Sequence, residues 1–561
     1  MSINNVRNLM NYKFCCILLL FSYISLLLSS HFTLILTYPP NPFYLFSNIS
    51  FIYWIGLGFL ITLIILKINL CGGNKILGKL LDIGILIFVS SYYYVGSFIY
   101  STIRYADSYN FYWNFVNPII SAGSLGAIDR TGMYSTVFNQ ATIFFTYLFQ
   151  LNSNPHLISN YFPIFVIILG SVLTYALATK YSNQYGLLGG IAFILLGCGL
   201  FHLSPQHYAY ILAFFSIYLI FKLLLFGNVE NNTQKKYLVL LIIFIMAILF
   251  SHLLTSIILL YTLVMVLIFG IVVDHIMIRS NHESDYKNIT FMNIGNFILP
   301  ISILFVGLMG YLLHYGYYYF KKLVFFSDGI LDSVLNYDPY AISLVHRTVV
   351  NTSPSDLYQL AYQMRIEVLI VYSVIGIVSS LFMYYFYYYR RNVDIWKPYL
   401  IGAATFFLVL FSFGAILILS GNSNYGFGRA LPISLIPLGI LITALYSQRI
   451  IMKHSIKMAL KIFIILTLIV LMVIAPITNY ASDPYHFYSE SEDKANKFGM
   501  SYLDDFVIIS GYNWVISKIT YNRMVLKEQS GLEYLNKFVG KNVNKIYDVG
   551  DNAKMYRDVI T

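Results

Sequence analysis

Long apolar runs, separated by short polar connections, occupy most of the chain. Each run has about 18 to 22 residues, the length of helix that crosses the roughly 30 Å hydrocarbon core of a bilayer. The apolar residues are consecutive rather than alternating, and this pattern favours helices over the strands of a membrane β-barrel. Thirteen spanning helices are predicted, over residues 14–37, 51–70, 80–100, 157–178, 186–203, 207–226, 237–251, 254–273, 291–316, 366–389, 399–419, 431–447 and 460–477.

The first long polar stretch, residues 101–155, directly follows a predicted span. It contains one further apolar piece, Thr136–Leu151, which is short and carries Asn139, Gln140 and Gln150. We interpret this piece as a partly inserted or broken helix that packs near the outer face without crossing. Residues 101–155 are therefore interpreted as the reaction loop of a membrane enzyme.

The tail, residues 478–561, is mostly polar and long enough for a small α+β domain outside the membrane. A short helix is predicted over Gly531–Val539. Lys545–Val549 and Ala553–Arg557 are predicted as the strands of a terminal hairpin, because Gly and Asp fill the turn between them.

Composition agrees with an all-α polytopic membrane protein, since 58% of the residues are hydrophobic and only 11% are charged. The net charge is +11, but most Lys and Arg lie at helix ends, which argues against nucleic acid as a partner. The first apolar run continues through Leu36 without a clear cleavage site, so we expect a retained span rather than a signal peptide. The four cysteines lie in or beside apolar runs and show no metal-binding or disulfide spacing; they are Cys15, Cys16, Cys71 and Cys198.

Basic residues cluster in every second connection, and cytoplasmic loops are the ones enriched in Lys and Arg. This places the N-terminus in the cytoplasm and the C-terminus outside the cell membrane, provided that Thr136–Leu151 does not cross. The clusters predicted inside are Arg7 and Lys13; Lys67, Lys75 and Lys79; Lys222, Lys235 and Lys236; Arg390, Arg391 and Lys397; and Arg449, Lys453, Lys457 and Lys461.

The same topology collects the elaborate polar segments on the outer side, where we expect the chemistry. These segments are residues 101–135, 202–207, 251–256, 321–365, 420–429 and the tail. Three parts of the chain are predicted: an N-terminal helical hairpin over 1–79, a transmembrane domain over 80–477, and a soluble domain over 478–561.

Asp107 is the leading catalytic candidate. A carboxylate at the water–lipid boundary, among the aromatic residues of YADSYNFYWNF, can act as a general base. It could equally hold a divalent metal ion or recognise a basic group, and the plain alternative is a solvated helix-capping residue, since Ser108 and Asn110 follow.

Arg429 lies in NYGFGRALPI, where an outer turn re-enters the membrane. Its fork of N–H donors suits a phosphate, although an interfacial Arg that only reaches toward water is an equal alternative. His252 in SHLLTS and His207 in SPQHY lie at outer turns, where a histidine can bind an anion, shuttle a proton or be purely structural. His346 and Arg347 are polar groups of the 321–365 loop.

Several of these features follow one another along the chain in a fixed order. Asp107 follows an early span, a Tyr-led segment YSTVFNQATIFFTYLFQLNSNP begins at Tyr134, and the turns SPQHYAYILAF and SHLLTS come next. Arg429 then begins R-A-L-P before a late span, and NKIYDVGDNAKMYR ends the chain. Over residues 80–561 the chain resembles the membrane glycosyltransferases of the GT-C fold, in particular archaeal-type members related to the protein mannosyltransferase and lipid-A aminoarabinose transferase group.

The resemblance implies a sugar donor linked to polyprenyl phosphate, which enters from the membrane lipids. The acceptor, which is a protein, a lipid or a glycan, would enter from outside. Asp107 would deprotonate an acceptor hydroxyl, and Arg429 and His252 would hold the donor phosphate; no cofactor is implied with certainty. Further substrate contacts are expected from Arg104, Asp129, Tyr134, His207, His346 and Arg347.

The chain departs from the family in two ways. Many members have paired acids in the first loop, but Asp107 is followed by Ser108 and the next acid is Asp129. The WWD motif of the oligosaccharyltransferase branch is missing, since the tail has only Asn513-Trp514-Val515. A lipid-linked saccharide transporter or flippase, a surface-polysaccharide polymerase and a noncatalytic scaffold remain as alternatives.

Overall fold

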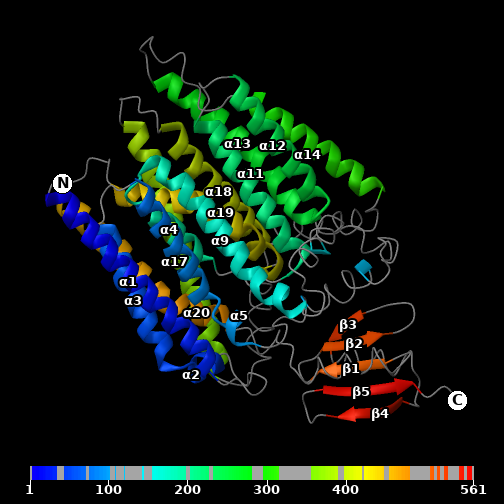
Figure 1. Ribbon diagram of the computed structural model, residues 1–561. Coiled ribbons are helices and arrows are strands. Elements are labelled where there is room, and N and C mark those ends of the chain that lie inside the picture. Colours follow the sequence, from blue (N-terminus) through cyan, green and yellow to red (C-terminus); the bar gives the residue numbers. More distant parts are fainter. Residues whose placement is uncertain are drawn as a thin grey trace.

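A computed structural model describes most of the helical part of the chain and five strands of the tail (Figure 1). The described residues are 3–33, 43–70, 75–100, 108, 119–120, 142–143, 155–197, 203–225, 231–280, 295–314, 356–389, 397–419, 423–447, 454–480, 506–510, 514–518, 524–527, 543–548 and 553–558.

Within these ranges, thirteen helices of eleven or more residues lie where the thirteen apolar runs are. Nine of the described helices are long and apolar enough to cross a membrane, which identifies a polytopic helical membrane protein. The long helices are α1 (Ile3–Phe32), α3 (Phe51–Leu70), α4 (Lys75–Tyr93), α9 (Pro155–Tyr181), α10 (Gly186–Leu196), α11 (Pro205–Leu225), α12 (Asn231–Leu249), α13 (Leu253–Ser280), α14 (Gly295–His314), α17 (Asp356–Tyr389), α18 (Lys397–Leu419), α19 (Ser423–Ser447) and α20 (His454–Tyr480); α2 (Tyr44–Asn48) and α5 (Gly96–Ile99) are short.

Helix α10 is shorter than the sequence predicts. The apolar run continues to residue 203, but the helix has only 11 residues and ends before Gly197. At 1.5 Å of rise per residue it is about 16 Å long, roughly half the thickness of a bilayer core. All of its residues are buried, and the Tyr93 hydroxyl donates a hydrogen bond of 3.0 Å to the Gly197 carbonyl just beyond its end.

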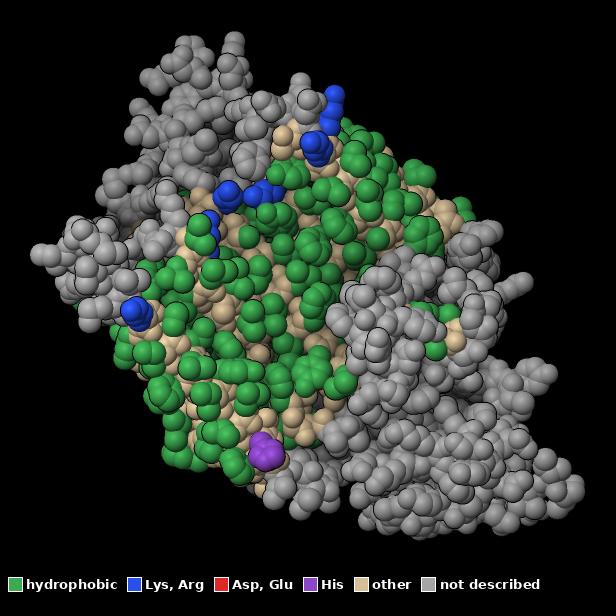
Figure 2. Space-filling model, viewed as in Figure 1, with side chains coloured by type: hydrophobic (Ala, Val, Ile, Leu, Met, Phe, Trp, Pro, Cys, Tyr) green, Lys and Arg blue, Asp and Glu red, His purple; other side chains and the backbone are tan. Residues whose placement is uncertain are grey.

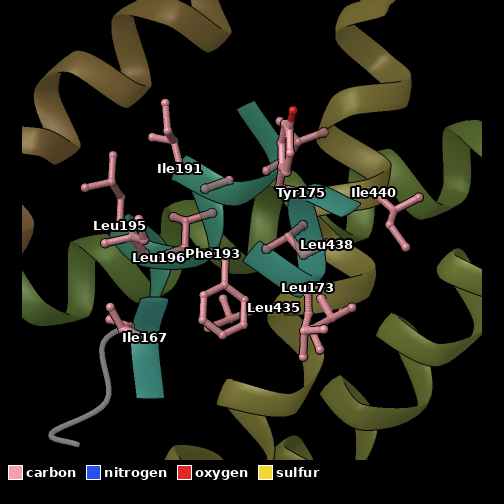
Figure 3. Close-up of a cluster of buried hydrophobic side chains, with 14 of the residues drawn as sticks. Ile167, Leu173, Tyr175, Ile191, Phe193, Leu195, Leu196, Leu435, Leu438 and Ile440 are labelled. Atoms are coloured by element: carbon pink, nitrogen blue, oxygen red, sulfur yellow. The ribbon is translucent and has the colours of Figure 1, made fainter. Parts of the chain in front are cut away.

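Helix α19 is the central element of the bundle, since nearly all its side chains from Ala430 to Tyr446 are buried. It packs against α18, α10 and α9, and Figure 3 shows Leu435 and Leu438 of α19 beside Phe193 of α10. Backbones approach closely where α10 crosses α19: a Cβ atom added at Gly189 would lie 2.7 Å from the carbonyl oxygen of Gly439. Larger residues would force the two helices apart.

Helices α4 and α9 run in opposite directions and contact each other along their lengths. Near one end, the Asn160 amide donates a hydrogen bond of 3.1 Å to the carbonyl of Tyr100. Near the other end, the Tyr175 hydroxyl donates one of 3.0 Å to the Asp82 carboxylate. The chain therefore leaves α5 and returns to α9 at the same end of the bundle.

The N-terminal helices α1 and α3 pack against α4 through hydrogen-bonded tyrosines and one ion pair. The Tyr92 hydroxyl donates to the Ser22 carbonyl at 2.7 Å, and the Tyr53 hydroxyl donates to the Tyr92 carbonyl at 3.0 Å. Lys67 of α3 forms a buried ion pair with Asp82 of α4 at 2.8 Å. Helices α3 and α4 are thus joined across the boundary that the sequence places at residue 79.

Apolar side chains cover the broad outer face of the described helices, and Lys and Arg side chains gather toward one end of that face (Figure 2). Such an apolar belt is what hydrocarbon contact requires. Of the predicted inner basic residues, Lys461 lies over the rings of Tyr185 and Tyr446, with its Nζ atom 5.5 and 5.2 Å from their centroids.

The described strands of the tail form one antiparallel sheet in the order β3-β2-β1-β5-β4. The predicted hairpin corresponds to β4 and β5, which pair with Tyr547 opposite Met555 and a register shift at Lys545/Tyr547. The predicted helix Gly531–Val539 lies outside the described residues. The strands are β1 (Phe506–Ser510), β2 (Trp514–Lys518), β3 (Met524–Lys527), β4 (Val543–Asp548) and β5 (Ala553–Asp558).

Candidate functional site

Three of the predicted site residues belong to the described part of the chain: His207, His252 and Arg429. They come from three different helix starts, at α11, α13 and α19. The remaining predicted site residues lie outside the described residues; they are Arg104, Asp107, Asp129, Tyr134, His346 and Arg347.

The start of α11 is fixed by a cap that the sequence SPQH encodes. Pro205 is the first helical residue, where its missing N–H and its fixed φ are tolerated best. Ser204 caps the helix, because its hydroxyl oxygen accepts the backbone N–H of His207 at 3.3 Å. The same hydroxyl lies 2.6 Å from His207 Nδ1, so the buried imidazole ring is held beside the helix start.

The start of α13 has a similar cap, in which the histidine itself is the capping residue. His252 directly precedes the helix, and its Nδ1 accepts the backbone N–H of Thr255 at 3.3 Å. The hydroxyl of Thr255 lies 2.9 Å from the same nitrogen, and the His252 carbonyl accepts the Ser256 N–H at 3.2 Å. These contacts fix the position and the rotation of the His252 ring.

Arg429 lies in the second turn of α19, close enough to act electrostatically on groups of two other elements. Its positive charge acts on the His252 ring and on the Tyr210 hydroxyl of α11. The Arg429 cluster here means Arg429 of α19 and the two groups that its charge reaches, His252 in the α12–α13 turn and Tyr210 of α11. The family resemblance implies that Arg429 and His252 hold one phosphate, and in the structure the Arg429 charge acts on the His252 ring.

His252 is neutral in this cluster over the physiological pH range. Burial, and secondarily the Arg429 charge, lower the pKa of His252 to about 3. The hydrogen bond from the Thr255 backbone N–H is consistent with a neutral ring. An N–H group can only donate, so Nδ1 accepts this bond, and an accepting ring nitrogen carries no proton.

Tyr210 and Gln206 are members of this region that the sequence analysis missed. The Gln206 amide donates a hydrogen bond to the Tyr210 hydroxyl, and the fully buried Tyr210 ring meets the His207 ring edge-on at 5.4 Å between centroids. The available signal was the i, i+4 spacing of Gln206 and Tyr210 in SPQHYAY, which places both side chains on one face of a helix.

The segment over residues 101–155 reaches the same end of the bundle through its described residues. Its described residues Ile120 and Ile143 pack around Leu203, next to the cap of α11, together with Ile158 of α9 and Tyr208 of α11. Ser108, next to Asp107 in the sequence, is buried. The α11 start is therefore in contact with the loop on one side and contributes Tyr210 to the Arg429 cluster on the other.

The chemistry of the cluster favours an anion. Arg429 provides a permanent cation with several N–H donors, and neutral His252 provides an Nε2–H donor. Among the described residues, no group of three His, Cys, Asp or Glu side chains could hold a metal ion. The arrangement suits a phosphate group that is bound by charge and hydrogen bonds.

No protein-family model matches the chain, and no curated protein matches it.

Proposed function

We propose that this protein is an integral membrane glycosyltransferase that moves a sugar from a polyprenyl-phosphate donor to an acceptor on the extracytoplasmic face. The observation that carries the proposal is the Arg429 cluster, in which the charge of a guanidinium on α19 reaches a neutral imidazole in the α12–α13 turn. A phosphate at a lipid boundary is the ligand that such a pair fits best.

The position of the cluster supports this assignment. The reaction loop begins and ends at the end of the bundle where Tyr100 meets Asn160, and Ile120 and Ile143 of the loop pack beside the α11 start. A phosphate bound at Arg429 would therefore lie near the segment that contains Asp107, the proposed base.

The proposed topology has 13 spans, with the N-terminus in the cytoplasm and the C-terminus outside. The antiparallel packing of α4 and α9 supports it, because a single crossing by Thr136–Leu151 would make these two helices parallel. The gathering of Lys and Arg toward one end of the apolar face supports the orientation. The sheet of the tail would then belong to a small extracytoplasmic domain.

In the proposed reaction, the acceptor oxygen bonds to the anomeric carbon as the bond from that carbon to the phosphate oxygen breaks. Asp107 takes the acceptor proton, and the phosphate leaves with the bonding electron pair. Its charge becomes more negative, and the Arg429 guanidinium stabilises that charge.

A transporter or flippase would place ionisable groups within the bundle along the substrate path. The buried Lys67–Asp82 pair is one such feature. Its charges compensate each other, and Tyr175 satisfies the second carboxylate oxygen. This arrangement is better explained as a structural link between helices, so we favour the transferase.

The test is a transfer assay with the full chain in lipid nanodiscs, labelled polyprenyl-phosphate sugars and a panel of hydroxyl acceptors. We expect Asp107→Asn to abolish transfer while its level in the membrane stays normal, because the amide cannot accept the acceptor proton. Asp332→Asn, in another predicted outer loop, is the matched control and should transfer normally. Wild-type turnover by Asp107→Asn would refute the assignment of the base.

A further inference from the structure

His252 has two ring nitrogens with separate roles in the structure. Nδ1 accepts the backbone N–H of Thr255 at 3.3 Å and lies 2.9 Å from the Thr255 hydroxyl. A neutral imidazole with an accepting Nδ1 carries its proton on Nε2. The nitrogen that caps α13 is therefore an acceptor, and the other nitrogen is a donor.

We propose that His252 acts as a fixed neutral donor, whose Nδ1 caps α13 while its Nε2–H binds the donor phosphate beside Arg429, and that it transfers no proton in the reaction. This inference rests on the proposed function, because it names how one residue of that site contacts the substrate. It separates His252 from Asp107, to which we assign the proton transfer.

Three features oppose a proton on Nδ1. An added proton would replace the lone pair that accepts the Thr255 N–H, and it would leave that N–H unsatisfied at a helix start. It would place a second cation near Arg429. It would also add positive charge at the positive end of the α13 dipole.

Among the residues that the structure describes, the groups packed around the α12–α13 turn do not offset these costs. On α19 the described charged group is Arg429. On α11, the Tyr210 hydroxyl is also acted on by the Arg429 charge. On α14, Tyr311 belongs to the apolar cluster against which Leu253 packs, and it meets the Phe250 ring edge-on at 6.3 Å. The guanidinium is a cation, and the two tyrosines are neutral at physiological pH, so each leaves the imidazole uncharged. Burial acts in the same direction and, with Arg429, keeps the pKa of His252 near 3.

Two amide side chains separate the two roles. The Asn carbonyl takes the place of Nδ1, so His252→Asn keeps the cap, but its amide N–H is too short to reach the position of Nε2. The Gln amide N–H reaches that position, so His252→Gln keeps the donor and weakens the cap. His252→Ala loses both.

The experiment measures undecaprenyl phosphate binding, sugar transfer and thermal unfolding for the full-length wild type and these three variants in nanodiscs. We expect His252→Asn to unfold like the wild type and to bind about three- to tenfold more weakly, the usual effect of one neutral hydrogen bond. His252→Gln should bind more tightly than His252→Asn, because it keeps a donor near the position of Nε2, but it should unfold at a lower temperature. His252→Ala should show both defects.

Wild-type binding by His252→Asn would overturn the phosphate contact, because it would leave His252 with a capping role alone. Normal binding but lost transfer in His252→Gln would also overturn the inference, since that result identifies a proton-transfer role. If the wild type neither binds undecaprenyl phosphate nor transfers a sugar from an undecaprenyl-phosphate-linked sugar, the proposed function fails as well. A wild type that binds and transfers while the variants break the expected pattern contradicts this inference alone.

Discussion

Two regions of the bundle contain charged side chains among apolar helices, and they differ in what surrounds the charge. In the first, Lys67 meets the carboxylate of Asp82 at 2.8 Å, and Tyr175 donates to the other carboxylate oxygen. In the second, the Arg429 charge acts on a neutral histidine and a buried tyrosine. The first region is an ion pair that joins two helices, whereas the second combines a cation with N–H donors that suit an anionic ligand.

The strongest test of this comparison removes one charge of the ion pair. We expect Asp82→Asn to destabilise the protein by about 3–5 kcal/mol, because Lys67 would remain as a buried charge without its carboxylate. Thermal unfolding in detergent measures the loss. Adding Lys67→Met should restore most of the stability, and failure of this second change would show that the pair does more than join α3 to α4.

The corresponding change in the second region should affect the substrate rather than the fold. Arg429→Ala is expected to weaken donor use tenfold or more, since loss of a charge-assisted hydrogen bond costs about 1.5–3 kcal/mol. Donor-concentration dependence of transfer measures this effect, and the unfolding temperature should stay close to that of the wild type.

Lys461→Ala, which removes a cation over Tyr185 and Tyr446, is the matched control for Arg429→Ala and should leave donor use unchanged. A large drop in thermal stability for Arg429→Ala would contradict the comparison, because it would make Arg429 a structural cation like Lys67.

The close crossing of α10 and α19, the helix that carries Arg429, can be tested through stability. Gly189→Ala should destabilise the protein by about 1–3 kcal/mol, because its Cβ would lie 2.7 Å from the Gly439 carbonyl oxygen and 2.8 Å from Thr443 Oγ1. Gly310→Ala, where no atom lies within 4 Å of the added Cβ, is the matched control and should be neutral or slightly stabilising. Equal unfolding temperatures for the two variants would refute the close crossing.

The last test is the acid sensitivity that His252 gives to the second region. Its folded pKa, about 3, lies below the ordinary value of 6.5, so the unfolded chain binds a proton that the folded chain does not between these values. Stability should therefore fall as the pH drops from 6.5 toward 3, by at most about 1.4 kcal/mol per pH unit from this group.

Unfolding of the wild type and of His252→Gln at pH 5 and pH 7.5 measures this contribution. The variant should lose less stability on acidification than the wild type, and an equal loss in both chains would contradict a neutral, partly buried His252.

The helices could be predicted from the sequence because a bilayer demands long apolar runs, and each predicted run contains a helix. The end of α10 could not, since Gly197 lies inside an apolar run and the break depends on contacts such as the Tyr93 hydroxyl. Both histidine turns were recognised as candidates, but their capping geometry was not. The meeting of Arg429 and His252 was expected only from a family resemblance, because residues so far apart in sequence are joined by packing that no local pattern shows. Tyr210 was missed because the sequence alone does not distinguish it from the other tyrosines of the apolar helices.

The short α10 also has a consequence for how the protein enters the membrane. A helix of eleven residues is too short to cross the bilayer core on its own. Helix α9 is long and apolar enough to insert, and only residues 182–185 separate the two helices. We therefore expect α9 and α10 to enter the bilayer together as a helical hairpin, so that lengthening the 182–185 turn would impair biogenesis before any folded contact forms.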